Sequence, residues 1–129
     1  MRKNKRILVK HLSSLGILLV GFLECRYAVF GVIHGMKDWP VVLAGLGAVV
    51  LLLSVLTKKV YLPWFVSIGY SVGFLAGTLF HAEGLDSGGG KTDNLWMIWT
   101  VVFLVCILAG VVLESVMKWR KLLKSKITK

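Results

Sequence analysis

Cysteine and proline are scarce in this chain of 129 residues, which contains two of each. The cysteines, Cys25 and Cys106, form no Cys-x-x-Cys pair, so nothing supports a thiol–disulfide enzyme. Both fall within apolar runs, where we interpret them as small core residues. No proline interrupts the middle of such a run, and the broken helices on which transporters build their substrate sites are therefore not indicated.

Polar residues are also too few for the surface of a soluble domain, because 57% of the residues are hydrophobic. Four apolar runs approach or exceed the length that a helix needs to cross a membrane. These runs cover residues 12–33, 41–56, 61–80 and 95–113, between basic tails at residues 1–11 and 117–129. The sequence therefore predicts an all-α polytopic membrane protein, a single-domain antiparallel bundle of four transmembrane helices without internal repeats.

Acidic residues number six, against sixteen lysines and arginines. The basic residues gather before the first run, between the second and third, and after the fourth, while the other side carries only Lys37 and Lys91. By the positive-inside rule, this bias predicts a multi-pass protein of the cell membrane with both termini in the cytoplasm. The same basic segments predict contact with anionic lipid headgroups. Nucleic-acid binding is not expected, because no recognised motif or folded basic surface accompanies the charge.

Glycine recurs at every fourth position in the third apolar run, as Gly69, Gly73 and Gly77. Small residues at this spacing let another helix approach closely, which is one way that helices associate within a membrane. A second pair, Gly31 and Gly35, continues a small-residue face of the first run. Two such faces favour a homo-oligomer or a complex with a larger membrane partner, unless they pack against each other. The third run is expected at the centre of the bundle.

A few polar side chains lie inside the apolar runs and are candidates for an intramembrane function. Glu24 lies on the small-residue face of the first run, a stripe at helical spacing that also includes Ser13, Ile17, Gly21, Ala28, Gly31 and Gly35. Arg26 points away from it, either to the headgroups or to an acidic residue on another helix. On the third run, Ser67, Ser71 and Thr78 either hydrogen-bond to their own helix or line a polar path. The polar path would make the chain a small transporter or channel that uses Glu24.

The segments predicted on the outer side carry four more candidates, which are His34, His81, Glu83 and Asp86. If these side chains converged at the outer mouth of the bundle, they would permit a membrane enzyme, although nothing in their spacing requires it. The leading hypothesis is instead a non-enzymatic membrane protein that associates through its glycine-rich faces. We predict no catalytic residue, no cofactor and no defined metal site.

The glycine-rich segment 84–92 does not match a phosphate-binding P-loop, because Leu85 stands where that motif needs glycine. A loose cation site remains an open alternative, with oxygens from Glu83, Asp86, Asp93 and Asn94. The simpler interpretation is a solvated turn that reverses the chain, with Thr92 or Asp93 capping the fourth helix.

Two further carboxylates stand at predicted helix ends. Asp38 precedes the second run and is placed to cap it. Glu114 lies four residues before Lys118, which is the favourable order for an ion pair within one helix.

Three motifs follow one another in the second half of the chain: Gly-Tyr-Ser-Val-Gly-Phe-Leu-Ala-Gly at residues 69–77, Glu83-Gly-x-Asp86-x-Gly-Gly-Gly90, and Asn94-x-Trp96-x-x-Trp99. With them, the chain resembles small four-span bacterial membrane proteins to which no activity is assigned. The resemblance covers about a third of the chain and implies a four-span fold without implying a reaction or a ligand.

Overall fold

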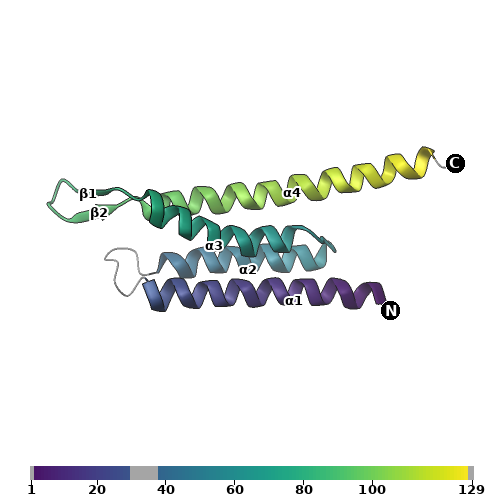
Figure 1. The fold of residues 1–129 in the computed structure, drawn as a ribbon, viewed down its shortest axis with the longest axis horizontal. Helices are drawn as coiled ribbons and strands as arrows, with labels where there is room; N and C mark the ends of the chain where they lie inside the picture. Colours follow the sequence, from purple (N-terminus) through teal and green to yellow (C-terminus); the bar gives the residue numbers. More distant parts are fainter. Residues whose placement is uncertain (1, 30–37, 128–129) are drawn as a thin grey trace.

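The computed structural model describes residues 2–29 and 38–127 and is built almost entirely of helix. Its elements are α1 (Arg2–Leu23), which continues into a π-helical turn η1 (Glu24–Val29), α2 (Trp39–Leu56), α3 (Leu62–Phe80), the strands β1 (Glu83–Leu85) and β2 (Lys91–Asp93), and α4 (Leu95–Ile127) (Figure 1). Each of the four long helices contains a segment that is long and apolar enough to cross a membrane. The prediction of an all-α fold with four long apolar helices is confirmed, and these helices are consistent with a multi-pass membrane protein.

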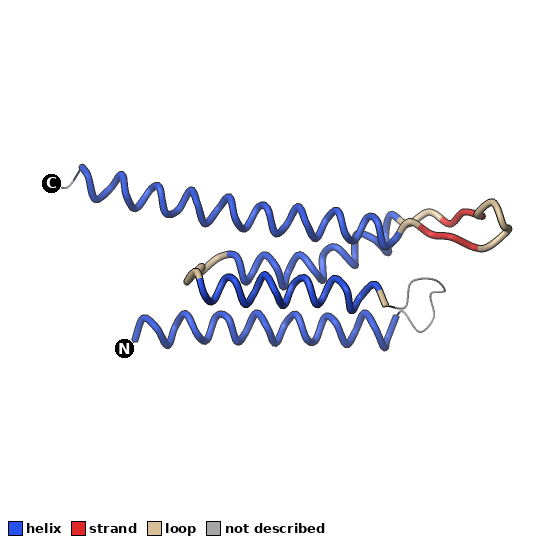
Figure 2. The backbone as a smooth tube through the Cα atoms, turned by 180° about the vertical axis from the view of Figure 1, so that it is seen from behind, coloured by secondary structure: helices blue, strands red, loops and turns tan. Residues whose placement is uncertain are grey.

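Successive helices run in alternating directions (Figure 1). The start of α1, the α2–α3 turn and the end of α4 lie at one end of the bundle, which we call the terminal end; β1 and β2 lie at the opposite hairpin end. In both views α2 and α3 lie between α1 and α4 (Figure 2). Helix α3 packs against each of the other three, most extensively against α4, so the expected central position of the third span is confirmed.

The core lies where α3 meets α4 and α2. Val66, Tyr70, Trp99 and Phe103 are fully buried there. The ring of Tyr70 meets those of Trp99 and Phe103 edge-on, with ring centroids 5.0 and 5.9 Å apart. Such pairs contribute about 0.5–1.5 kcal/mol each beyond the area they bury. The outward faces of all four helices remain apolar and exposed, as a surrounding bilayer requires.

Helices α1 and α4 both extend beyond the predicted spans into the basic tails. Helix α4 has 33 residues, which at 1.5 Å per residue is about 50 Å, longer than the roughly 30 Å hydrocarbon core of a bilayer. Its last turns therefore project past the bundle at the terminal end (Figure 1). Near its other end, α1 gives way to η1, whose wider turns alter the register that a regular α-helix would give to residues after Glu24.

The segment predicted as a turn that reverses the chain does so as a short antiparallel hairpin, in which Glu83 pairs with Asp93 and Leu85 with Lys91. Its turn is held by Asp86, whose Oδ1 accepts hydrogen bonds from the N–H groups of Gly88 and Gly90 at 2.9 and 2.8 Å. Gly89 adopts a φ of 81°, which glycine supplies without strain. The cluster of glycines therefore closes the turn of a two-stranded hairpin.

Candidate functional sites along the bundle

The glycine stripe of α3 (Gly69, Gly73 and Gly77) is buried against α4 of the same chain. A Cβ atom on Gly73 would lie 2.7 Å from Cδ1 of Trp99 and 3.0 Å from its carbonyl oxygen. A Cβ on Gly77 would lie 3.0 Å from the carbonyl oxygen of Leu95. These distances leave no room for a side chain, so the stripe sets the spacing of α3 and α4. It is occupied within the chain and does not offer a free surface to another molecule.

The hydroxyls of α3 do not share one polar path. Ser67 is buried and donates to the carbonyl oxygens of Ser14 and Pro63, at 2.6 and 3.2 Å. Ser71 is exposed at the edge of the α1 contact, and Thr78 donates to the carbonyl of Leu75 at 2.8 Å. Ser67 thus joins α3 to α1, and Thr78 bonds to its own helix as lone hydroxyls commonly do.

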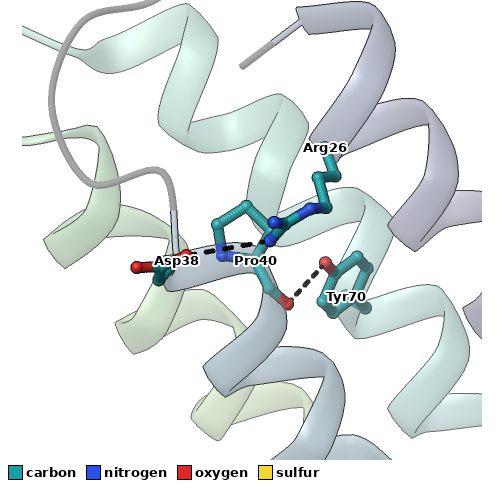
Figure 3. A network of polar contacts seen from close by, with 4 residues as sticks. All are labelled: Arg26, Asp38, Pro40 and Tyr70. Atoms are coloured by element: carbon teal, nitrogen blue, oxygen red, sulfur yellow. Dashed lines mark hydrogen bonds and ion pairs between the residues drawn. The ribbon is translucent and has the colours of Figure 1, made fainter. Parts of the chain in front are cut away.

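Arg26 lies near an acidic residue at the start of another helix, which agrees with one of the two alternatives predicted for it (Figure 3). Its Nη1 lies 3.9 Å from Oδ1 of Asp38, immediately before α2. Asp38 makes no side-chain cap to α2, so the predicted capping role is wrong. Beside this pair, the hydroxyl of Tyr70 donates to the carbonyl of Pro40 at 3.0 Å, which ties α3 to the start of α2. The carboxylate of Asp38 is 92% exposed, and such a pair contributes about 0–1 kcal/mol.

Glu24 begins η1 and is exposed on the surface of α1. The predicted small-residue face does not act as one unit, because Gly21 is buried against Tyr70 whereas Ser13, Ile17 and Glu24 are exposed. Gly31 and Gly35, which were expected to continue this face, lie outside the described residues. So does His34.

The remaining outer candidates do not gather into a site. His81 Nδ1 lies 2.7 Å from the carbonyl oxygen of Thr78, Glu83 is exposed on β1, and Asp86 holds the hairpin turn. Within residues 2–29 and 38–127, no group of three or more His, Cys, Asp or Glu side chains could hold a metal ion.

Two of the oxygens considered for a cation site support the backbone. Oδ1 of Asp93 accepts a hydrogen bond from the N–H of Leu95 at 2.6 Å, which is the predicted cap of α4. Oδ1 of Asn94 accepts one from the N–H of Ala82 at 2.7 Å and closes the base of the hairpin. Together with the turn at Asp86, these bonds give the acidic segment a structural role.

Glu114 has a role that its spacing from Lys118 did not reveal. Its carboxylate accepts hydrogen bonds from the backbone N–H of Val60, at 3.1 and 3.2 Å, and of Tyr61, at 2.8 Å. These N–H groups stand at the start of α3, where helix donors lack partners and a negative charge is favourable. Glu114 therefore anchors the start of α3 to α4 at the terminal end.

A pocket of about 840 Å³ lies beside this anchor. It is bounded by Ile7 of α1, by the α2–α3 turn and by α4, and four lysines line it: Lys58, Lys59, Lys118 and Lys121. The sequence places these lysines in two segments almost sixty residues apart. Their convergence could not be read from either segment alone.

The turn that carries Lys58 and Lys59 ends α2 with a strained backbone conformation at Lys58. Lys59 N donates to the carbonyl of Ser54 and Lys58 N to that of Val55, the paired bonds of a Schellman motif. Lys58 occupies the left-handed position of this motif with a φ of 53°, where glycine is usual. A side chain in that conformation costs about 1–2 kcal/mol.

His11 is a second residue that the sequence did not single out. It is 6% exposed, and its Nδ1 lies 2.8 Å from the carbonyl oxygen of Ile7. Since a carbonyl only accepts, Nδ1 carries the proton. Among the described residues, nothing hydrogen-bonds to Nε2. His11 lines a smaller hollow of about 170 Å³ that shares Ile7 and Lys58 with the lysine pocket.

Comparison of the chain with family models, with curated proteins and with solved structures finds no match in any of the three.

Proposed function

We propose that this chain is a non-enzymatic protein of the cell membrane, with both termini in the cytoplasm, that works by associating with a larger membrane protein. The orientation is supported by the basic residues at the terminal end, where the start of α1, the α2–α3 turn and the end of α4 come together. In this orientation the hairpin faces the outside.

The observation that carries the proposal is the exposed carboxylate of Glu24, at the outer end of the apolar segment Ile7–Tyr27. A carboxylate that faces lipid is costly, even though the cost falls toward the interface. Polar side chains of neighbouring membrane helices are the usual way to satisfy such a group. Ser13 and Ile17 lie exposed on the same side of α1 and extend this surface, which we call the Glu24 face.

A larger partner satisfies the Glu24 face better than a second copy does. In a two-fold dimer through this face, the two Glu24 carboxylates would approach each other, and like charges repel. A different protein can present a cation or a hydrogen-bond donor instead. The glycine stripe, the other candidate surface, is already filled by α4.

Site-directed crosslinking tests the Glu24 face. A single cysteine replaces Ile17 in a chain that also carries Cys25→Ala and Cys106→Ala, and it is labelled with a photoactivatable maleimide in native membranes. Leu19→Cys is the matched control, because Leu19 is also apolar and is more exposed than Ile17, at 57% against 39%, but lies on another side of α1. We expect a protein adduct from position 17 and none from position 19, and we expect Glu24→Leu to abolish it.

The mass of the adduct distinguishes the occupants. An adduct at twice the chain's 14.3 kDa would show a second copy and contradict the larger partner. Equal adducts from both positions, or none from position 17, would remove the Glu24 face as an interface. Glu24→Gln keeps an oxygen that accepts hydrogen bonds but removes the negative charge. An adduct that survives this substitution indicates a partner that donates a hydrogen bond, and a lost adduct indicates a partner that needs the charge.

A further inference from the structure

The lysine pocket concentrates positive charge at one level of the molecule. Lys58 and Lys59 come from the α2–α3 turn, and Lys118 and Lys121 from α4. The one acidic residue in its lining is Glu114. That carboxylate is already engaged by the N–H groups of Val60 and Tyr61, so it leaves most of the lysine charge for another anion. Four ammonium groups around one pocket repel one another unless an anion lies among them.

The depth of the pocket matches that of lipid headgroups. The apolar part of α4 runs from residue 95 to residue 113, which is about 28 Å and close to the thickness of the hydrocarbon core. The pocket lining on α4 begins at the next residue, Glu114. Ile7 and Met117 add apolar surface to the same lining. A ligand with a phosphate at one end and hydrocarbon at the other fits this division.

His11 supplies an independent observation beside the lysines. Its buried Nε2 has no hydrogen-bond partner among the described residues, and the hollow that it lines shares Ile7 and Lys58 with the lysine pocket. With the proton on Nδ1, this Nε2 can accept a hydrogen bond from a hydroxyl. Headgroups that carry glycerol offer such hydroxyls next to their phosphate.

We infer that the lysine pocket is a binding site for the phosphate of an anionic phospholipid headgroup. Basic pockets between membrane helices bind such headgroups through charge and hydrogen bonds. The inference rests on one part of the proposed function, the orientation with both termini in the cytoplasm. That orientation places the pocket in the cytoplasmic leaflet, where anionic lipids supply the phosphate. The inference does not depend on the Glu24 face.

The test uses the full chain in nanodiscs that contain phosphatidylcholine with increasing phosphatidylglycerol, with bound lipid counted by native mass spectrometry after release. The probe variant is Lys118→Gln with Lys121→Gln. The matched control is Arg120→Gln with Lys126→Gln, which removes two charges from the same part of α4 but from residues that do not line the pocket. Both leaflets of a nanodisc carry the anionic lipid, so a negative result counts against the site and not against the proposed orientation.

We expect the apparent Kd for phosphatidylglycerol to rise roughly thirtyfold in the probe variant, since a basic residue near anionic lipid is worth about a fivefold change. The control should change little. An equal loss in both variants would overturn the site and indicate general attraction between the tail and the membrane. If inorganic phosphate competes for the pocket as well as the lipid does, the site binds free phosphate and the assignment to a phospholipid headgroup is wrong.

Lys58→Gly protects the test from a folding defect. Glycine is the residue that suits the backbone at this position, so this variant is expected to fold at least as well as the wild type. It removes one lysine from the pocket, and we expect about fivefold weaker lipid binding by a chain of undiminished stability. Unchanged binding by Lys58→Gly together with unchanged binding by the probe variant would contradict the inference.

Discussion

The side of α3 that faces α4 and the side that faces α1 hold their neighbours by different means. Toward α4, the glycine stripe brings the two backbones together, and Trp99 donates from Nε1 to the carbonyl of Tyr70 at 2.9 Å. Toward α1, the hydroxyl of Ser67 donates to the carbonyl of Ser14 at 2.6 Å. The first contact combines the absence of side-chain volume with hydrogen bonds, whereas the second includes a single hydroxyl that bonds across the helices. The two sides should therefore respond to different kinds of substitution.

The largest effect is expected from Gly73→Leu, on the α4 side. Its Cβ alone would lie 2.7 Å from a ring atom of Trp99 and 3.0 Å from the Trp99 carbonyl, and the backbone cannot yield cheaply. Overpacking typically costs about 1–3 kcal/mol of unfolding free energy, and this substitution is expected at the upper end of that range. Denaturant unfolding in micelles, followed by tryptophan fluorescence, measures it. Gly16→Leu is the control, because a Cβ on Gly16 meets nothing within 4 Å, and equal losses in the two variants would refute the steric account.

Glu114→Ala should come next and shows that the α4 side also has a polar anchor. The substitution leaves the N–H groups of Val60 and Tyr61 without their acceptor, which costs about 1–3 kcal/mol. Hydrogen exchange at the first turn of α3 should quicken at the same time. Ser115→Ala serves as the control, since among the described residues the Ser115 hydroxyl bonds within α4, to the carbonyl of Val111. Unchanged exchange at α3 would show that the anchor contributes nothing.

Ser67→Ala tests the α1 side directly. Interhelical hydrogen bonds in membranes contribute about 0.6 kcal/mol on average and up to about 1.7 kcal/mol, so a loss in this range is expected. The same unfolding measurement applies. Ser54→Ala is the comparison, because the buried Ser54 hydroxyl bonds within its own helix, to the carbonyl of Leu51 at 2.7 Å. If Ser54→Ala costs as much as Ser67→Ala, the hydrogen bond between α1 and α3 has no special weight.

An effect of opposite sign is expected from Lys58→Gly. Relief of the left-handed backbone should raise the unfolding free energy by about 1 kcal/mol. Lys59→Gly, at the next residue of the turn, removes the same charge without that relief and should bring no gain. A stabilisation by both substitutions would point to charge repulsion in the lysine pocket as the cause.

Several features of this chain followed from local pattern alone. Apolar run length predicted four helices, and the spacing of Gly69, Gly73 and Gly77 predicted a close helix contact. Asp93 was one of the two predicted caps of α4, and its carboxylate accepts a hydrogen bond from the first N–H of the helix, because capping depends on neighbours two or three residues away. These properties are set by residues near one another in the sequence.

Only the tertiary structure decided which surfaces meet. A periodic stripe defines a face of a helix but does not identify the helix that covers it. Here α4 covers the glycine stripe, which the sequence had offered as a surface for binding another molecule. Glu114 was assigned to Lys118 because they are close in sequence, whereas packing brings its carboxylate to the start of α3. The lysine pocket and the buried His11 arise in the same way, because contacts between distant segments depend on how the helices pack and leave no local pattern.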